Sequence, residues 1–254
     1  MAANLDLREK GAIRNGERLS SSERLFMQLL AFGGCADAAA LAKALAAARV
    51  ESVLYEDIHD PRGVGLLTWS PDPNFFAGEL RKFLLTPPFA SLACKPDTSM
   101  LGRTYAIGHE PDLEAWLFDR PCRTVLNPAW PWAVWYPLRR AGAFSALAPE
   151  EQGAILSEHG KIGHAFGEAG YAHDVRLACF GLDRNDNDFV IGLIGSELHP
   201  LSACVQAMRK TQQTSRYIEA MGPFFIGKAV WQSPIQAGSA NRADGADIAN
   251  GPAF

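Results

Sequence analysis

Residues 132–166 read WAVWYPLRRAGAFSALAPEEQGAILSEHGKIGHAF, a stretch in which a strand is followed by a long helix. The aromatic-rich segment Trp132–Leu138 is typical of a strand. Pro149–Phe166 has helical spacing and begins with Pro149 and two glutamates, residue types that suit the first turn of a helix. We therefore predict that a strand and a long helix open the second half of the chain.

The chain after this helix is predicted to add two strands, another helix and a last strand. Val175–Gly181 and Asp188–Ile194 are apolar segments that flank a polar turn. Apolar residues at helical spacing predict a long helix over Pro200–Met221, and Phe224–Val230 is predicted to be the last strand. The second half therefore has the order β-α-β-β-α-β.

The first half shows the same order of elements, although sequence identity between the halves is slight. Asp37 is placed to cap the first of its two helices. The predicted strands and helices are, in chain order, Arg24–Phe32, Ala36–Ala47, Val50–Glu56, Gly63–Trp69, Pro73–Leu85 and Met100–Ile107. We therefore predict an α+β fold in which two ferredoxin-like βαββαβ repeats form a dimeric α+β barrel.

The repeat and the polar ends divide the chain into five segments. We expect flexible tails at residues 1–20 and 233–254, because both ends are polar and poor in apolar residues. Between them lie a first ferredoxin-like half at 21–110, a linker at 111–131 and a second half at 132–232 that carries the ligand site.

The overall composition argues against several classes of partner. A net charge of −4 offers no basic surface for nucleic acid. No uncharged apolar run is long enough to cross a membrane, and the N-terminus lacks the apolar segment of a secretory signal. The five cysteines are scattered without metal-binding spacing. We expect a cytoplasmic protein with no nucleic-acid partner and no membrane span.

Among the six histidines, His159 has the most informative position. On a regular helix Ile155 and Ile162 share its face, so His159 should lie on the apolar side that meets the sheet. A buried histidine must be neutral and either hydrogen-bonded or coordinated. The neutral imidazole is also the form that binds iron axially. The nucleotide-binding GxGxxG and Walker motifs, the zinc-binding HExxH and the hydrolase GxSxG are all absent from the sequence.

The second half resembles the chlorite dismutase family, which includes the coproheme decarboxylases of heme biosynthesis. The resemblance covers roughly residues 132–227 and rests on an ordered set of short motifs. These are WYPLRR at 135–140, EHGKIG at 158–163, GLD at 181–183 with DF at 188–189, MRKT at 208–211, SRY at 215–217 and PFFIG at 223–227. The first half is similar mainly in its predicted topology.

The resemblance implies a cofactor and a set of residues that bind it. His159 matches the proximal ligand to the iron, and Tyr136 matches the tyrosine that carries the radical in the decarboxylases. Arg140 falls where the decarboxylases have lysine or arginine; a cation there could lower the proton affinity of the phenol and hold a propionate. Arg209 and Thr214 match positions that bind propionates. The implied cofactor is heme b or iron coproporphyrin III (coproheme).

Two departures from the family pattern bear on the chemistry. Gln212 stands where many members have a glutamate that accepts the proximal imidazole proton, which should make the ligand less electron-donating. On the distal side, the position of the family's arginine or glutamine falls on Asp174. Arg176 on the same strand face could point over the iron, and His173 could serve as a base. The sequence leaves these distal alternatives open.

The first hypothesis is a heme-dependent oxidoreductase that carries out peroxide-dependent oxidative decarboxylation of coproheme. In this hypothesis Tyr136 is the redox group and His159 the axial ligand. One alternative is a chlorite- or peroxide-consuming heme oxidoreductase that uses Arg176, and another is a non-catalytic heme carrier or sensor. The expected partners are a porphyrin, a small oxidant (peroxide or an oxyanion) and further copies of the chain, with a pentamer favoured over a dimer.

Overall fold

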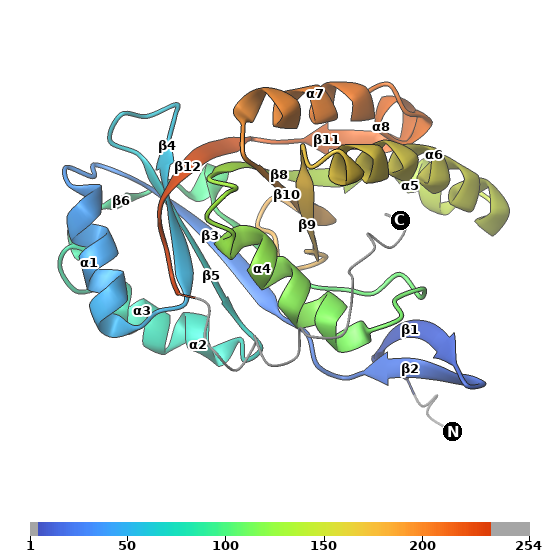
Figure 1. Ribbon diagram of the computed structural model, residues 1–254, viewed down its shortest axis with the longest axis horizontal. Helices are drawn as coiled ribbons and strands as arrows, with labels where there is room; N and C mark the ends of the chain where they lie inside the picture. Colours follow the sequence, from blue (N-terminus) through green and yellow to red (C-terminus); the bar gives the residue numbers. More distant parts are fainter. Residues whose placement is uncertain (1–4, 235–254) are drawn as a thin grey trace.

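Eight strands close into an antiparallel barrel, because β8 pairs with β10 at the two ends of the strand order (Figure 1). The structure, a computed structural model, describes residues 5–234. Around the barrel the strands are β10 (Phe189–Gly195), β9 (His173–Ala178), β7 (Met100–Arg103), β3 (Phe26–Gly33), β5 (Val64–Ser70), β4 (Ser52–Asp57), β12 (Phe225–Gln232) and β8 (Trp132–Arg140). Two short strands extend this sheet, β6 (Ala93–Cys94) beside β3 and β11 (Ile218–Met221) beside β8.

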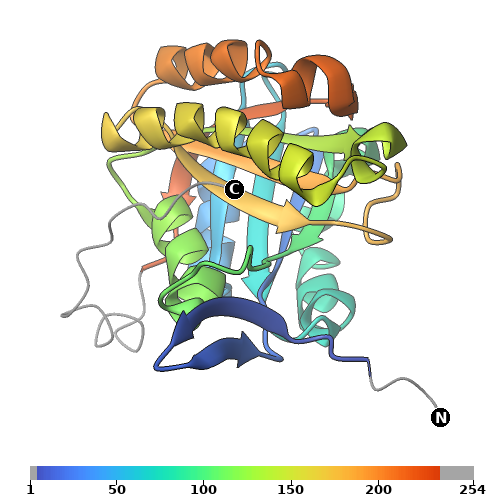
Figure 2. The same ribbon diagram turned by 90° about the vertical axis from the view of Figure 1, so that its right-hand side faces the viewer.

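Helices cover the outer face of the sheet in both halves (Figures 1 and 2). Those of the first half are α1 (Ala38–Ala48), α2 (Asn74–Ala77) and α3 (Glu79–Leu84). Those of the second half are α5 (Gly142–Ser145), α6 (Pro149–Glu168), α7 (Leu198–Met208) and α8 (Gln212–Tyr217). Between the halves, a π-helical turn at Ala115–Asp119 leads into α4 (Arg120–Leu126). In the described part of the chain, none of the helices combines the length and apolar character that a membrane crossing requires.

The alternation of side chains along each strand separates two cores. Trp135 points into the barrel and packs with apolar residues of both halves, among them Tyr55 and Phe225. The next residue, Tyr136, faces outward and packs with Leu201 of α7. We call the four strands of the second half, in the order β9-β10-β8-β12, the second sheet. The period-2 alternation places one face of this second sheet under helices. The predicted α+β class with a large antiparallel sheet is confirmed.

Most predicted elements appear close to their expected bounds, and the predicted helix cap is present. Asp37 Oδ1 accepts hydrogen bonds from the backbone N–H groups of Ala39 and Ala40, at 2.9 and 3.1 Å. Two helices that were predicted to be continuous are each divided into two shorter helices. The helix predicted over 73–85 is broken at Gly78, and the helix predicted over 200–221 ends at Met208. After α8, residues 218–221 pair with β8, because sheet pairing there replaces the helical hydrogen bonds.

The prediction of a flexible tail at residues 1–20 was wrong for most of that segment. β1 (Glu9–Arg14) and β2 (Glu17–Ser21) form an antiparallel hairpin. Asn15 and Gly16 both have positive φ, 53° and 84°, as a tight two-residue hairpin turn requires. An Asn-Gly pair is a strong hairpin signal, so the sequence carried this information. The predicted C-terminal tail lies, from residue 235 on, outside the described residues.

We expect Gly192→Ala to destabilise the fold. A Cβ atom at this position in β10 would lie 2.6 Å from the indole ring of Trp135, which is fully buried. Overpacking of this kind costs about 1–3 kcal/mol. The measurement is the free energy of unfolding from urea denaturation.

Gly153→Ala is the matched control, because a Cβ atom at Gly153 in α6 would meet no atom of another residue within 4 Å. Alanine is the better helix former, so this variant should gain about 0.5–1 kcal/mol. Equal stability of the two variants would contradict the packing described for β10.

Candidate functional site

The outer face of the second sheet carries a row of three side chains from neighbouring strands. Ile191 of β10 pairs with Tyr136 of β8 on one side and with Arg176 of β9 on the other. Residues paired in this way project from the same face of the sheet. The register therefore brings together two of the residues predicted from the sequence, Tyr136 and Arg176, beneath the helices of the second half.

His159 lies on α6, and its contacts define which ring nitrogen is free. Its Nδ1 atom is 3.2 Å from Oγ1 of Thr211, which lies between α7 and α8. The Thr211 hydroxyl donates its proton to the Met208 carbonyl at 2.8 Å, so its oxygen accepts from Nδ1–H of the imidazole. Nε2 is then the nitrogen that keeps its lone pair, as an axial metal ligand must.

The surroundings of His159 keep its ring neutral. Burial lowers the pKa of His159 to about 4, and the positive charges of Arg140 and Arg176 act in the same direction. An imidazole with this pKa is uncharged at neutral pH, so its lone pair is available to a metal. The prediction that His159 is on the sheet-facing side agrees with this burial.

Tyr136 is deeply buried, and its hydroxyl is held in the protonated form. Burial raises the pKa of Tyr136 well above its usual value, while the charge of Arg209 acts weakly in the opposite direction. Its ring stacks on Phe224 of the segment before β12, with centroids 4.6 Å apart and planes inclined by 21°. The phenol is therefore packed in one orientation and does not titrate near neutral pH.

Arg140 does not act on Tyr136 as the sequence reasoning expected. Its guanidinium carbon lies 4.4 Å from the ring centroid of Phe144 and 4.9 Å from that of Phe189. Its charge lowers the pKa of His159 and opposes the rise, caused by burial, in the pKa of Tyr105. The expectation that Arg140 lowers the proton affinity of Tyr136 is therefore corrected: the phenol it influences is Tyr105.

Tyr105 is a residue of the site region that the sequence did not reveal. It follows β7 in the first half and lies 5.8 Å, between ring centroids, from Phe189 of the second half. The charges of Arg176 and Arg140 both reach its hydroxyl. Because Tyr105 lies outside the motifs of the second half, only the closure of the barrel brings it to this region.

Arg176 forms an ion pair with Asp174 of its own strand, and the linker adds Arg120 to this pair. Asp174 of β9 has its Oδ2 atom 2.7 Å from Nε of Arg176 and its Oδ1 atom 2.5 Å from a terminal nitrogen of Arg120 in α4. Burial alone would raise the pKa of Asp174, but the two guanidinium groups hold it well below its usual range. The ring of Trp116 lies near both arginines, 4.7 and 5.2 Å from their guanidinium carbons. No sequence motif pointed to Arg120 or Trp116.

His173 is not brought to the face that carries Tyr136. It pairs with Ile194, whose side chain belongs to the core inside the barrel, and its ring stacks on Trp130 with centroids 3.5 Å apart. Residues 173 and 176 are three apart on one strand, so they point to opposite faces. This placement corrects the suggestion that His173 could serve as a distal base, and His173 is not carried into the proposed site.

The two predicted propionate-binding residues lie at the junction of α7 and α8. Arg209 is exposed directly after α7, and its charge reaches Tyr136. The backbone N–H of Thr214, in the first turn of α8, is 3.4 Å from Oγ1 of Thr211. Gln212 is exposed and its backbone N–H donates to Glu158 at 3.0 Å. The partner of the imidazole is therefore Thr211, one position before the residue that the sequence reasoning considered.

The comparisons with known proteins agree with this description. Residues 121–230 match the family model described as chlorite dismutase, which confirms the resemblance found in the second half. The fold is similar to that of a heme-binding protein from Thermus thermophilus, with 20% identity, a TM-score of 0.64, and coverage of 86% of this chain and 96% of that chain. It is also similar to chlorite dismutase from Candidatus Nitrospira defluvii, with 15% identity, a TM-score of 0.60, and coverage of 82% and 92%. No curated protein matches the sequence.

We expect Asp174→Asn to lower stability in a pH-dependent way, because it leaves two guanidinium groups without their counter-charge. For a half-buried pair the loss should be about 1–3 kcal/mol at pH 7. The depressed pKa of Asp174 contributes stability above the unfolded pKa of about 3.9 and loses it as the pH falls through the folded value. The difference between variant and parent in urea denaturation should therefore shrink below about pH 4.

Asp186→Asn serves as the control, since Asp186 is 89% exposed and its oxygen lies 3.4 Å from Arg139. This variant should change stability by less than about 0.5 kcal/mol. If Asp174→Asn proved as stable as the parent at pH 7, the ion pair would not restrain Arg176 as described.

Proposed function

We propose that this chain, which matches the chlorite dismutase family over residues 121–230, binds an iron porphyrin between α6 and the outer face of its second sheet. His159 is the axial ligand in this proposal. The observation that carries it is the contact between His159 Nδ1 and the Thr211 hydroxyl, which leaves Nε2 of a neutral imidazole free. The contact supports the tautomer that iron requires, and the lowered pKa of His159 supports the neutral form.

The chemistry of the surrounding residues fits a porphyrin with carboxylate side chains. The Nε atoms of Arg140 and Arg176 are buried, and neither has a well-aligned hydrogen-bond partner within residues 5–234. Arg209 and Thr214 lie near the same helix junction as the partner of His159. Arginine binds carboxylates through paired, charge-assisted hydrogen bonds. We assign Arg140, Arg209 and Thr214 to the propionate groups.

The topology supports the same interpretation. The first half has the strand order β7-β3-β5-β4 and the second half β9-β10-β8-β12. In each half, the fourth strand lies beside the first, then come the third and the second, which is the order of a ferredoxin-like unit. We therefore interpret the chain as a dimeric α+β barrel in which only the second half carries the porphyrin site. The proposal includes a cytoplasmic homo-oligomer, with a pentamer favoured over a dimer.

The reaction that we propose is the peroxide-dependent oxidative decarboxylation of coproheme, with Tyr136 as the redox group. The chemistry that a bound iron porphyrin would supply is its reaction with peroxide, and peroxide is the oxidant of the decarboxylation. Tyr136 remains a protonated phenol at neutral pH, so it would give up its proton together with an electron. Its stacking on Phe224 holds the ring in one orientation during this step. Arg176, held by Asp174, would present a fixed positive charge to the oxidant.

Two other functions are each favoured by one observation. Arg176 lies on the same face as Tyr136, which favours a chlorite- or peroxide-consuming oxidoreductase that uses this arginine. The partner of His159 is a neutral hydroxyl and not a carboxylate, so the imidazole is a weaker electron donor. That feature favours a heme carrier or sensor that does not turn over.

Titration of the apoprotein with heme b and with iron coproporphyrin III, followed by Soret absorbance, tests the axial ligand. We expect His159→Ala to abolish the coordinated spectrum. Thr211→Val should weaken binding about 10–100-fold, as loss of a partner behind a metal-binding imidazole does, and Thr211→Ser should retain affinity. His199→Ala is the control, because His199 is exposed. An unchanged affinity and spectrum in His159→Ala would show that the proposed site is wrong.

The decarboxylation is tested by adding peroxide to the coproheme complex and following the loss of carboxyl groups by mass spectrometry. We expect Tyr136→Phe to bind coproheme normally and to lose decarboxylation, because phenylalanine keeps the packing and lacks the phenolic proton. Tyr171→Phe, at a tyrosine that is 53% exposed, should behave as the parent. Oxygen release from chlorite that depends on Arg176 would favour the oxidoreductase alternative, and tight heme binding without either activity would favour the carrier.

A further inference from the structure

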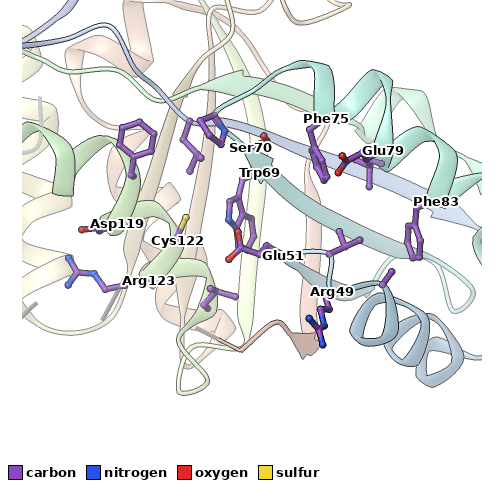
Figure 3. A pocket seen from close by; sticks show the side chains of 17 residues that line it. Arg49, Glu51, Trp69, Ser70, Phe75, Glu79, Phe83, Asp119, Cys122 and Arg123 are labelled. Carbon is purple, nitrogen blue, oxygen red and sulfur yellow. The ribbon is translucent and has the colours of Figure 1, made fainter. Parts of the chain in front are cut away.

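A cavity lies in the first half of the chain, apart from the residues of the proposed porphyrin site. It has a volume of about 540 Å³ and is bounded by the end of α1, by α2 and α3, and by the linker helix α4 (Figure 3). None of its lining residues is a residue assigned above to the porphyrin. Cavities of this size accommodate small organic molecules.

The cavity has an aromatic wall with a buried donor. Trp69 at the end of β5 is only 6% exposed and lines the cavity, with Phe75, Phe83 and Phe118 around it. Within residues 5–234, the indole N–H of Trp69 has no hydrogen-bond partner. Its nitrogen is not fully enclosed by protein atoms, so the N–H group remains accessible. A donor of this kind that opens on a cavity suits an oxygen atom of a ligand.

Two carboxylates face the aromatic wall. Figure 3 shows Glu51 beside Trp69 and Glu79 beside Phe75, with both carboxylates directed toward the centre of the cavity. Neither glutamate forms an ion pair with another residue of the described part of the chain. The guanidinium groups of Arg49 and Arg123 are directed to the edges in the same view. The interior therefore presents carboxylates and rings, while the positive charges lie at the periphery.

Cys122 lines the cavity on the side of α4, and its thiol is buried. Burial raises the pKa of Cys122 to about 12, and the carboxylates of Glu51 and Asp119 contribute to the rise. A thiol with this pKa is neutral and inert as a nucleophile at physiological pH. Cys122 is thus a lining residue and not a reactive group, and the smaller contribution of Glu51 to its raised pKa shows that this carboxylate lies near the cavity wall.

We propose that this cavity binds a small organic ammonium ion that has an aromatic or apolar body and an oxygen acceptor. The ammonium group would lie between Glu51 and Glu79, the body against Trp69 and Phe75, and the oxygen at the indole N–H. Carboxylates and aromatic faces both favour a cation, and their effects add in a partly desolvated site. The site is independent of the porphyrin, so its test does not depend on the function proposed above.

Three probes of one shape separate the contributions: 2-phenoxyethylamine, 2-phenoxyethanol and phenoxyacetate, which are cationic, neutral and anionic at pH 7. Calorimetry with the full chain should show the amine binding about tenfold more tightly than the alcohol, and phenoxyacetate binding most weakly. Glu51→Gln and Glu79→Gln should each weaken binding of the amine several-fold and leave that of the alcohol unchanged. Arg123→Gln is the control and should not weaken binding of the amine.

The melting temperature of each variant shows whether it is folded before its binding is compared. Equal affinity for the amine and the alcohol, preference for phenoxyacetate, or no binding of any probe would overturn the proposal. So would an affinity for the amine that is unaffected when both glutamates are replaced. Retention of porphyrin binding by Glu51→Gln and Glu79→Gln would show separately that the two sites are independent.

Discussion

The pairing of β8 with β10 is the constraint on which the rest of the structure depends. This pairing closes the barrel. Because β12 pairs with the other edge of β8, β8 has a neighbouring strand on both sides. This double pairing fixes which face each residue of β8 occupies. Trp135 is therefore part of the core shared by the two halves, while Tyr136 lies under α7. A slip of one residue would exchange these two environments, so the register and the site cannot be separated.

Charge around the site is distributed unevenly, and this distribution decides its chemistry. His159 has a neutral hydroxyl behind it and two guanidinium groups in its neighbourhood, so the ring is kept uncharged. A carboxylate behind the imidazole would make it a stronger electron donor. Asp174 pairs with both Arg176 and Arg120, so these three side chains together keep one net positive charge and Arg176 is held in place. The arrangement suits the uncharged axial ligand that we propose, next to a fixed positive charge.

The linker between the halves contacts both regions discussed above. Its helix α4 contributes Arg120 to the ion pair with Asp174, and on another side Cys122 and Arg123 to the lining of the cavity between the helices of the first half. Buried residues of the segment, such as Leu117, anchor it to the barrel. A segment expected only to connect two repeats thus lies between the outer face of the second sheet and the helices of the first half.

The sequence alone determined the features that depend on short-range physics. Strand alternation, helical spacing and the cap at Asp37 act over a few residues, and they predicted nearly every element. The opposite faces of His173 and Arg176 were also readable from the period of a strand, as was the hairpin from its Asn-Gly turn. His159 could be placed on the sheet-facing side of its helix for the same reason.

Tertiary structure alone decided which distant residues meet. Thr211 reaches His159 only because the α7–α8 junction packs on α6, and Tyr105 and Arg120 arrive from the first half and the linker. The end of the predicted helical region at residues 218–221 has the same origin, because pairing of these residues with β8 outweighs local helical preference. Thr211 is 52 positions from His159 in the sequence, and Arg120 is 54 positions from Asp174. Local patterns carry no signal over that distance, since closure of the barrel creates the contact.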